Sequence, residues 1–357
     1  MSSSPSILSR EFRALFQMRS SERLWHIPLL ASLCCGLPLV VGLSFGHLDA
    51  GLISCLAGLV ILYLPIAGVA QRMITMLVCG FVFMISFLVG LTFSFDPLVS
   101  SLVFGLFTVF VHWVSLFFKM KPPGSFFFIM LAAIASCMPF ELAAIPFKLG
   151  LVALGTMNAC LLALGYSLLM MRKHQYVPLS KPEEQSANLV ENWTEAAILG
   201  FFMFASMLLG HWLELKNPYW IPVSCAAVMQ GASTYHVWQR SFYRILGTLV
   251  GVGLCWVILS ITKNAWSICV AIIILQFVIE MLIVRHYALA VVFITPMTIL
   301  LTEAGNPLIH NPEVLVPIRF WNIALGSLIG AIGGWVIYNE RIRFIAKGRE
   351  RLQSGHL

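Results

Sequence analysis

The chain has 357 residues, of which 59% are hydrophobic and only 10% are charged. Its mean hydropathy of +0.90 and its few charges separate it from soluble domains, in which about 25% of residues are charged. The composition excludes a soluble globular protein and predicts an all-α, polytopic membrane protein. The net charge of +7 gives no indication of nucleic-acid binding, because the positions of the charges follow the membrane topology.

Twelve apolar runs follow one another along the chain, and each is long enough to cross the hydrocarbon core of a bilayer. In the first half of the chain they lie near residues 27–45, 51–70, 73–94, 97–118, 124–140 and 149–171. In the second half they lie near residues 196–213, 218–234, 243–262, 265–284, 287–302 and 317–338. We therefore expect about twelve transmembrane helices in two sets of six.

These runs divide the chain into five segments. A basic N-terminal segment (1–25), a first six-helix membrane repeat (26–171), a linker (172–195), a second six-helix membrane repeat (196–338) and a basic tail (339–357) follow in order. With both termini in the cytoplasm, all but four of the 22 Lys and Arg residues lie on the cytoplasmic side, the exceptions being Lys148, Lys216, Lys263 and Arg319. The positive-inside rule predicts this bias. We expect the basic ends to contact anionic membrane lipids.

The two six-helix segments resemble each other when the sequence is shifted by 168 positions. Trp25 then aligns with Trp193, and Gln71–Arg72 aligns with Gln239–Arg240. Because each segment has an even number of expected crossings, both would run in the same direction through the membrane, which is the parallel type of repeat. The pattern predicts a tandem duplication whose matched polar positions converge on a shared central route.

Cationic and aromatic residues are concentrated in HVWQRSFYRILGTLVG, residues 236–251. We expect this stretch in a cytoplasmic loop before the third helix of the second segment. Arg240 and Arg244, with Arg72 of the equivalent loop, are candidates to bind an anionic substrate, because a guanidinium donates two parallel hydrogen bonds to a carboxylate. Tyr243 is a candidate to stack on an aromatic substrate. The alternative is that the arginines bind lipid headgroups and the aromatic residues lie at the membrane interface.

Two strongly titratable residues lie well inside expected helices, His112 in the fourth and Glu280 in the tenth, again 168 positions apart. Such groups are costly inside a membrane and are functional candidates by default. If they face each other across the repeat axis, they would share a proton and couple protonation to anion transport. The structural alternative is that Glu280 pairs with Arg285 and that His112 donates one hydrogen bond within a helix contact.

The sequence gives no indication of an enzyme. All nine cysteines lie in apolar runs without a CxxC spacing, which favours a packing role. It contains no HExxH, GxSxG or P-loop motif, each of which would place catalytic or phosphate-binding groups together. We expect no metal and no cofactor.

The segment NPYWIPVSCAAVMQGASTYHVWQRSFYRILGTLVGVGL, residues 217–254, resembles the fusaric acid resistance-like (FUSC) and aromatic acid exporter family. The family pattern has a Trp near a helix start, a polar helix end and an Arg-containing loop leading into R-I-x-G-T-x-x-G. The matching residues here are Trp220, Gln230, Arg240, Arg244, Ile245, Gly247, Thr248 and Gly251. Trp220 and Gln230 thereby join the candidate substrate-binding residues.

The resemblance implies a protein of the bacterial inner membrane that exports small aromatic or amphipathic carboxylic acids, driven by the proton gradient. Many family members carry a large cytoplasmic domain between their membrane halves, where this chain has only the linker. A passive organic-anion channel and a scaffold or assembly factor without transport activity are the alternatives. The expected partners are a small organic anion and membrane lipids, together with a second copy of the chain or a periplasmic adaptor protein.

Overall fold

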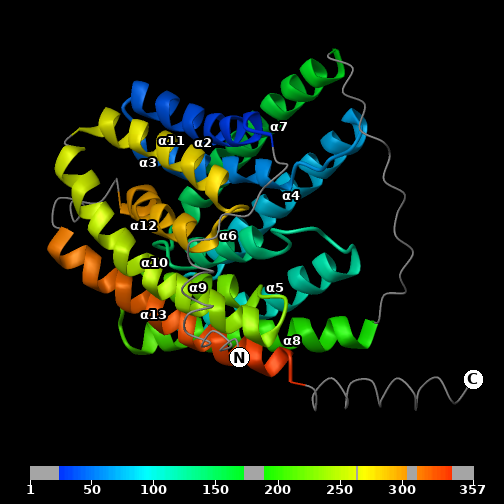
Figure 1. The fold of residues 1–357 in the computed structure, drawn as a ribbon, viewed down its shortest axis with the longest axis vertical. Coiled ribbons are helices and arrows are strands. Elements are labelled where there is room, and N and C mark those ends of the chain that lie inside the picture. The colour runs from blue at the N-terminus through cyan, green and yellow to red at the C-terminus, as the bar shows by residue number, and fades with distance from the viewer. Residues whose placement is uncertain (1–23, 173–188, 263, 304–311, 340–357) are drawn as a thin grey trace, which may run out of the picture.

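The computed structural model describes residues 24–172, 189–262, 264–303 and 312–339 (Figure 1). These ranges contain twelve α-helices and two 3-10 helices, and no strand occurs within them. The first six helices are α2 (His26–Ser44), α3 (Leu48–Gly58), α4 (Val69–Thr92), α5 (Pro97–Phe117), α6 (Phe126–Ser136) and α7 (Ile145–Arg172), with η1 (Leu59–Tyr63) and η2 (Leu142–Ala144). The second six are α8 (Leu189–Trp212), α9 (Trp220–Met229), α10 (Thr234–Ile261), α11 (Ala265–Leu282), α12 (Tyr287–Glu303) and α13 (Pro312–Ile337).

Eight of the described helices are long and apolar enough to cross a membrane: α2, α4, α5, α7, α8, α10, α11 and α13. The chain is therefore a polytopic α-helical membrane protein, as its composition predicts. The remaining four apolar runs form shorter helices, namely α3 with its continuation η1, α6, α9 and α12. Of the twelve expected spans, eight thus correspond to helices long enough to cross a membrane, and four correspond to shorter helices.

The short helices lie in the interior of the bundle, where α6, α9 and α12 are enclosed by the long helices (Figure 1). All ten residues of α9 are buried, as are residues 128–136 of α6. Helix ends at membrane depth need hydrogen-bond partners from the protein, since lipid offers none. Tyr338 supplies one, because its hydroxyl donates to the carbonyl oxygen of Gly231 just after α9, at 2.6 Å.

The two most extensive contacts between the six-helix halves are those of α5 along α8 and of α2 along α11, and smaller contacts join α6 to α9 and α3 to α12. We call the first two contacts the α5/α8 seam and the α2/α11 seam. A Cβ atom on Gly105 of α5 would lie 2.7 Å from Cβ of Phe204 on α8, and one on Gly36 of α2 would lie 2.5 Å from Cγ1 of Ile273 on α11. Gly36 and Phe204 are 168 positions apart, and so are Gly105 and Ile273. The duplication would produce this exchange of small and large residues, and the duplication itself stays a prediction.

The prediction of a loop at residues 236–251 is wrong, because this stretch is helical. Helix α10 begins at Thr234, and the side chain of Ser233 accepts a hydrogen bond from the backbone N–H of His236 at 3.3 Å. No proline or glycine interrupts the chain from Thr234 to Leu246, so the helix continues through its charged residues. Arg244 therefore lies about 15 Å along the helix axis from the first residue of α10.

Helices also begin earlier than expected at two other places. Arg72 lies in the first turn of α4, which begins at Val69, rather than in a loop. Helix α8 begins at Leu189, so the end of the expected linker is helical. The other parts of the expected terminal segments and linker, residues 1–23, 173–188 and 340–357, lie outside the described residues.

Candidate functional site

Arg244 is a buried cation inside the second half of the molecule. Its side chain is only 7% exposed, and its Nη2 donates to the hydroxyl oxygen of Ser224 on α9 at 3.3 Å. Its Nε is buried and has no hydrogen-bond partner among the described residues. Burying a charge with so few partners costs free energy. A bound anion would supply the missing acceptors.

The sequence of α10 places Arg244 there. Its buried residues Val237, Ser241, Arg244, Thr248, Gly251 and Cys255 recur every three or four positions and therefore share one face of the helix. Gly251 allows α12 to approach this face, since a Cβ atom there would lie 2.6 Å from the carbonyl oxygen of Val292. Ser241 donates to the carbonyl oxygen of Ser327 on α13 at 3.0 Å. The face that carries Arg244 is thus enclosed by α9, α12 and α13.

A second buried arginine lies near the start of α13. Arg319 is 5% exposed, and its Cζ lies 3.1 Å from the ring centroid of Trp220, the first residue of α9. Its Nη2 donates to the hydroxyl oxygen of Thr298 on α12. A guanidinium over the face of an indole is attracted by the electron-rich ring. Trp220 was expected to contact substrate, whereas Arg319 was missed because it was counted with the cations outside the membrane.

Trp220 and Ser224 lie on the same side of α9, because residues four positions apart are one turn apart on a helix. We call these two residues the α9 strip. Each of them contacts one buried guanidinium, Arg319 at Trp220 and Arg244 at Ser224. The α9 strip, together with the two guanidinium groups that contact it, therefore brings two positive charges close to an aromatic ring and a hydroxyl group. This combination suits a small anion, and in particular a carboxylate that carries a ring.

Arg240 and Tyr243 lie nearer the start of α10. The Cζ of Arg240 lies 4.9 Å from the ring centroid of Tyr287 on α12. Tyr243 is buried, and its hydroxyl accepts a hydrogen bond from Nε2 of Gln239 at 3.0 Å. These residues surround the approach to Arg244 along α10.

Two other candidates lie away from the α9 strip. Arg72 donates from Nη1 to the hydroxyl oxygen of Ser167 on α7 at 3.4 Å, so the structure does not bring it to Arg244. Gln230 directly follows α9, at the end opposite to Trp220, and its Nε2 donates to the carbonyl oxygen of Pro123 at 3.1 Å. This bond ties the end of α9 to the loop between α5 and α6.

His112 and Glu280 are not placed against each other. His112 on α5 shares a hydrogen bond of 2.7 Å between Nδ1 and the hydroxyl oxygen of Ser125. Its Nε2 lies 3.6 Å from Oε1 of Glu195 on α8. Glu280 is buried on α11 near Cys35 of α2, and Figure 1 shows α5 and α11 well apart. Each residue thus lies at a different seam, and Glu195 was missed because the expected linker included it.

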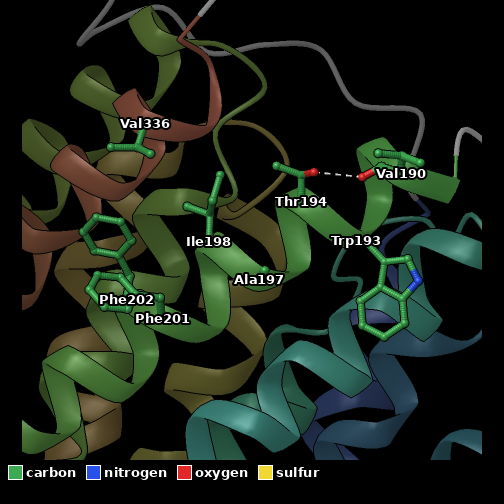
Figure 2. Close-up of a pocket in the computed structure, with 8 residues that line it drawn as sticks. All are labelled: Val190, Trp193, Thr194, Ala197, Ile198, Phe201, Phe202 and Val336. Carbon is green, nitrogen blue, oxygen red and sulfur yellow. Dashed lines mark hydrogen bonds between the residues drawn. The ribbon is translucent and has the colours of Figure 1, made fainter. Parts of the chain in front are cut away.

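A groove of about 760 Å³ lies along α8. Figure 2 shows its lining, which includes Trp193, Phe201 and Phe202 of α8 and Val336 of α13. Thr194 is the one polar residue in this lining, and its hydroxyl donates to the carbonyl oxygen of Val190 at 2.9 Å. The groove offers no charge to an anion, and its exposed aromatic rings fit contact with lipid chains. No group of three or more His, Cys, Asp or Glu side chains in the described ranges is placed to hold a metal ion.

Comparison with known proteins assigns the part of the chain that holds the α9 strip. Residues 204–333 match the family described as "Fusaric acid resistance protein-like". This part of the chain is similar to that family, and we call residues 204–333 the FUSC-like region. The FUSC-like region includes both buried arginines, and the match confirms the resemblance seen in residues 217–254.

A curated membrane protein is also similar to part of the chain. The "Uncharacterized membrane protein YvaC" of Bacillus subtilis (strain 168) is 34% identical over 141 residues, which cover 40% of this chain and 22% of the relative. The chain thus aligns with about a fifth of that relative's length. No solved structure matches the chain.

Proposed function

We propose that the protein is a secondary active exporter of small aromatic or amphipathic carboxylic acids in the bacterial inner membrane. The observation that carries this proposal is Arg244, a cation buried in the FUSC-like region whose one hydrogen-bond acceptor among the described residues is the hydroxyl of Ser224. Burying a positive charge inside a membrane protein costs free energy, so such a residue is a candidate for a functional role. The proposed role of Arg244 is to bind the carboxylate of the substrate, and Trp220 on the same side of α9 contacts the ring of the substrate.

The export mechanism follows from the two halves and their seams. The seam helices α8 and α11 pack on α9 and α12 of the second half, so rocking of one half against the other would move these helices and open the α9 strip inside the second half to each side in turn. His112 and Glu280 lie at the two seams, where such a movement changes their surroundings. Both residues are therefore the proposed proton-coupling groups, each acting at its own seam.

We also propose that all twelve helices traverse the membrane and that both termini face the cytoplasm. The hydroxyl of Tyr166, near the end of α7, lies 3.0 Å from Nδ1 of His26 at the start of α2. The neighbouring Ser167 binds Arg72 at the start of α4. Helices α2 and α4 thus begin on one face of the bundle, so α3 with η1 must return the chain to that face. The short helices can do this because they are enclosed by protein.

The test measures uptake of radiolabelled 4-hydroxybenzoate into inverted membrane vesicles under an imposed pH gradient. Arg244→Gln removes the charge at nearly the same length, and a charged hydrogen bond to the substrate is worth enough to lower the uptake rate about tenfold or more. Lys148→Gln removes the charge of a half-buried lysine in α7, away from the α9 strip, and this matched control should behave as the unchanged protein. Robust uptake that is equal in Arg244→Gln and in the unchanged protein would remove Arg244 from the site.

The same vesicles separate an exporter from a passive anion channel. An exporter driven by protons concentrates 4-hydroxybenzoate when a pH gradient is imposed at zero membrane potential. Flux that follows the membrane potential and ignores the pH gradient would identify a channel instead. A protein that moves no anion under either condition would have to be a scaffold or an assembly factor.

A further inference from the structure

We propose that anions cross the protein inside its second half, along the α9 strip between α9, α10, α12 and α13, and not along the contact between the two halves. Two stations mark this route. The inner station is Arg244 with Ser224, and the outer station is Arg319 with Trp220 and Thr298. This inference rests on the proposed function and assigns Arg319 a role in binding the transported anion.

The outer station has the geometry of a carboxylate site. The Cζ of Arg319 lies over the ring of Trp220, 3.1 Å from its centroid. Its Nη2 donates to the hydroxyl of Thr298, which helps to hold the position of the group. A guanidinium can bind a planar carboxylate with two parallel hydrogen bonds. The indole beside it offers an apolar surface to the rest of the ligand.

The two stations form a path, because both meet the same side of one short helix. Trp220 and Ser224 are one turn apart on α9, about 5–6 Å between their Cβ atoms. An anion released from Arg244 is therefore within a few ångströms of the cation at Arg319. Two binding groups in series allow an ion to enter and still leave, which a single tight site would prevent.

In the first half, the positions that the shift pairs with the two stations are apolar, although Arg72 contacts Ser167 and Tyr166 elsewhere in that half. The shift of 168 positions pairs Arg244 with Met76 and Ser224 with Leu56, both of which are buried. Thr298 pairs with Met130 and Trp220 with Leu52, again buried and apolar. Arg319 pairs with Leu151. The corresponding space in the first half is thus filled by apolar side chains, and the family match covers the second half alone.

The two seams are unsuitable for anions. Glu195 lies at the α5/α8 seam beside His112, and Glu280 lies at the α2/α11 seam. Carboxylates repel anions, whereas guanidinium groups attract them. Charge therefore directs an anion to the α9 strip and away from the contact between the halves.

The route is tested by the reaction rates of single cysteines with the anionic thiol reagent 2-sulfonatoethyl methanethiosulfonate. The experiment uses the full chain in vesicles, with its nine native cysteines replaced. Ser224→Cys and Thr298→Cys probe the two stations, and Leu56→Cys and Met130→Cys are their matched controls in the first half. We expect the second-half cysteines to react at least about tenfold faster than the controls, because a cationic path concentrates anions. The positively charged trimethylammonium analogue should not show this preference.

Equal rates in the two halves would overturn the route, and so would no reaction at either second-half cysteine. Size-exclusion chromatography in detergent shows whether each variant keeps the fold of the unchanged protein. The reaction rates of the cysteines can be measured without 4-hydroxybenzoate and without a proton gradient. These rates therefore separate failure of the route from failure of the proposed export activity.

The role of Arg319 is tested by the concentration dependence of 4-hydroxybenzoate uptake. Arg319→Gln should raise KM about tenfold, which corresponds to the loss of one charged hydrogen bond, and Arg319→Lys should restore part of the affinity. Lys148→Gln, which also removes one positive charge, is again the control. An unchanged KM in a folded Arg319→Gln protein would remove the outer station from the route.

Discussion

Arg244 is a positive charge that the fold holds away from water with one hydroxyl group as its acceptor. Its counterpart in the first half, Met76, is fully buried and apolar. At this pair of positions, the second half thus buries a charged side chain, which costs free energy of folding, whereas the first half buries an apolar side chain, which does not. This contrast indicates that Arg244 is retained for its chemistry and not for stability.

The change Arg244→Met tests that contrast, because it installs the residue of the first half. Replacing a poorly compensated buried charge by an apolar side chain of similar volume is neutral or stabilising by about 1–4 kcal/mol. We expect a higher Tm in detergent together with the loss of 4-hydroxybenzoate uptake. Thermal unfolding followed by tryptophan fluorescence measures the first effect. A lower Tm would show that Arg244 holds the bundle together.

Sequence reasoning found some residues of the site and missed others for a physical reason. Arg244 was identifiable because charges are rare in this chain, and Trp220 because it belongs to a family pattern. Ser224 and Thr298 were not, since small hydroxyl residues are common in apolar helices and only packing shows which of them face a cation. Arg319 lies near the start of an apolar run, where sequence alone cannot distinguish a residue at the membrane surface from one turned into the bundle.

At the scale of the helix, the packing of α13 on α9 positions both stations. A Cβ atom on Gly326 of α13 would collide with the backbone carbonyl oxygen of Ile221, which lies between Trp220 and Ser224 on α9. A backbone atom cannot move aside as a flexible side chain can. The glycine therefore sets the distance between the helix that carries Arg319 and the helix that carries the α9 strip.

Gly326→Ala should destabilise the protein by about 1–3 kcal/mol, as overpacking does in other close-packed interiors, and should reduce uptake as the stations separate. Gly165→Ala is the matched control, because Gly165 lies in α7, the corresponding helix of the first half, and a Cβ atom there would meet nothing within 4 Å. The control should be neutral or slightly stabilising, by up to about 1 kcal/mol of helix propensity. The Tm values of Gly326→Ala and Gly165→Ala are compared with that of the unchanged protein. Equal changes in Tm for the two variants would contradict the tight α13–α9 contact.

The number and order of the helices could be predicted from the sequence, but their lengths could not. Hydropathy records how apolar a run is, and the run that became α9 is as apolar as those that became long helices. Whether such a run faces lipid or protein depends on its neighbours. The loop expected around Arg240 failed for a related reason, since charge suggested a surface position whereas local propensity favoured continued helix.

At the scale of the whole molecule, the two halves meet in a reciprocal way. Gly36 and Gly105 each receive a larger side chain from the opposite half, Ile273 and Phe204 respectively. The sequence shift relates these pairs to each other, although no single pair reveals it, because glycine is frequent in membrane helices. Only the packing shows that the matched positions lie at seams and not on a shared central route.

The path of the chain through the membrane gives the last prediction, because it depends on whether the short helix α3 with η1 crosses. Helix α2 ends before Phe45, and α4 begins after Ile66, and both of these loop residues are highly exposed. If α3 and η1 cross, Phe45→Cys and Ile66→Cys lie on opposite sides of the membrane. If they do not, both lie on the same side.

A membrane-impermeant maleimide distinguishes these cases in a background without native cysteines. Phe45→Cys should react in intact cells, and Ile66→Cys should react only in inverted vesicles, because the contacts of His26 and Arg72 with α7 place the starts of α2 and α4 on one face. Phe95→Cys and Phe118→Cys, in the next two loops, are controls that should repeat this alternation. Reaction of both Phe45→Cys and Ile66→Cys from the same side would mean that α3 only dips into the bundle. In that case α4 would run in the opposite direction, and the parallel repeat could not hold.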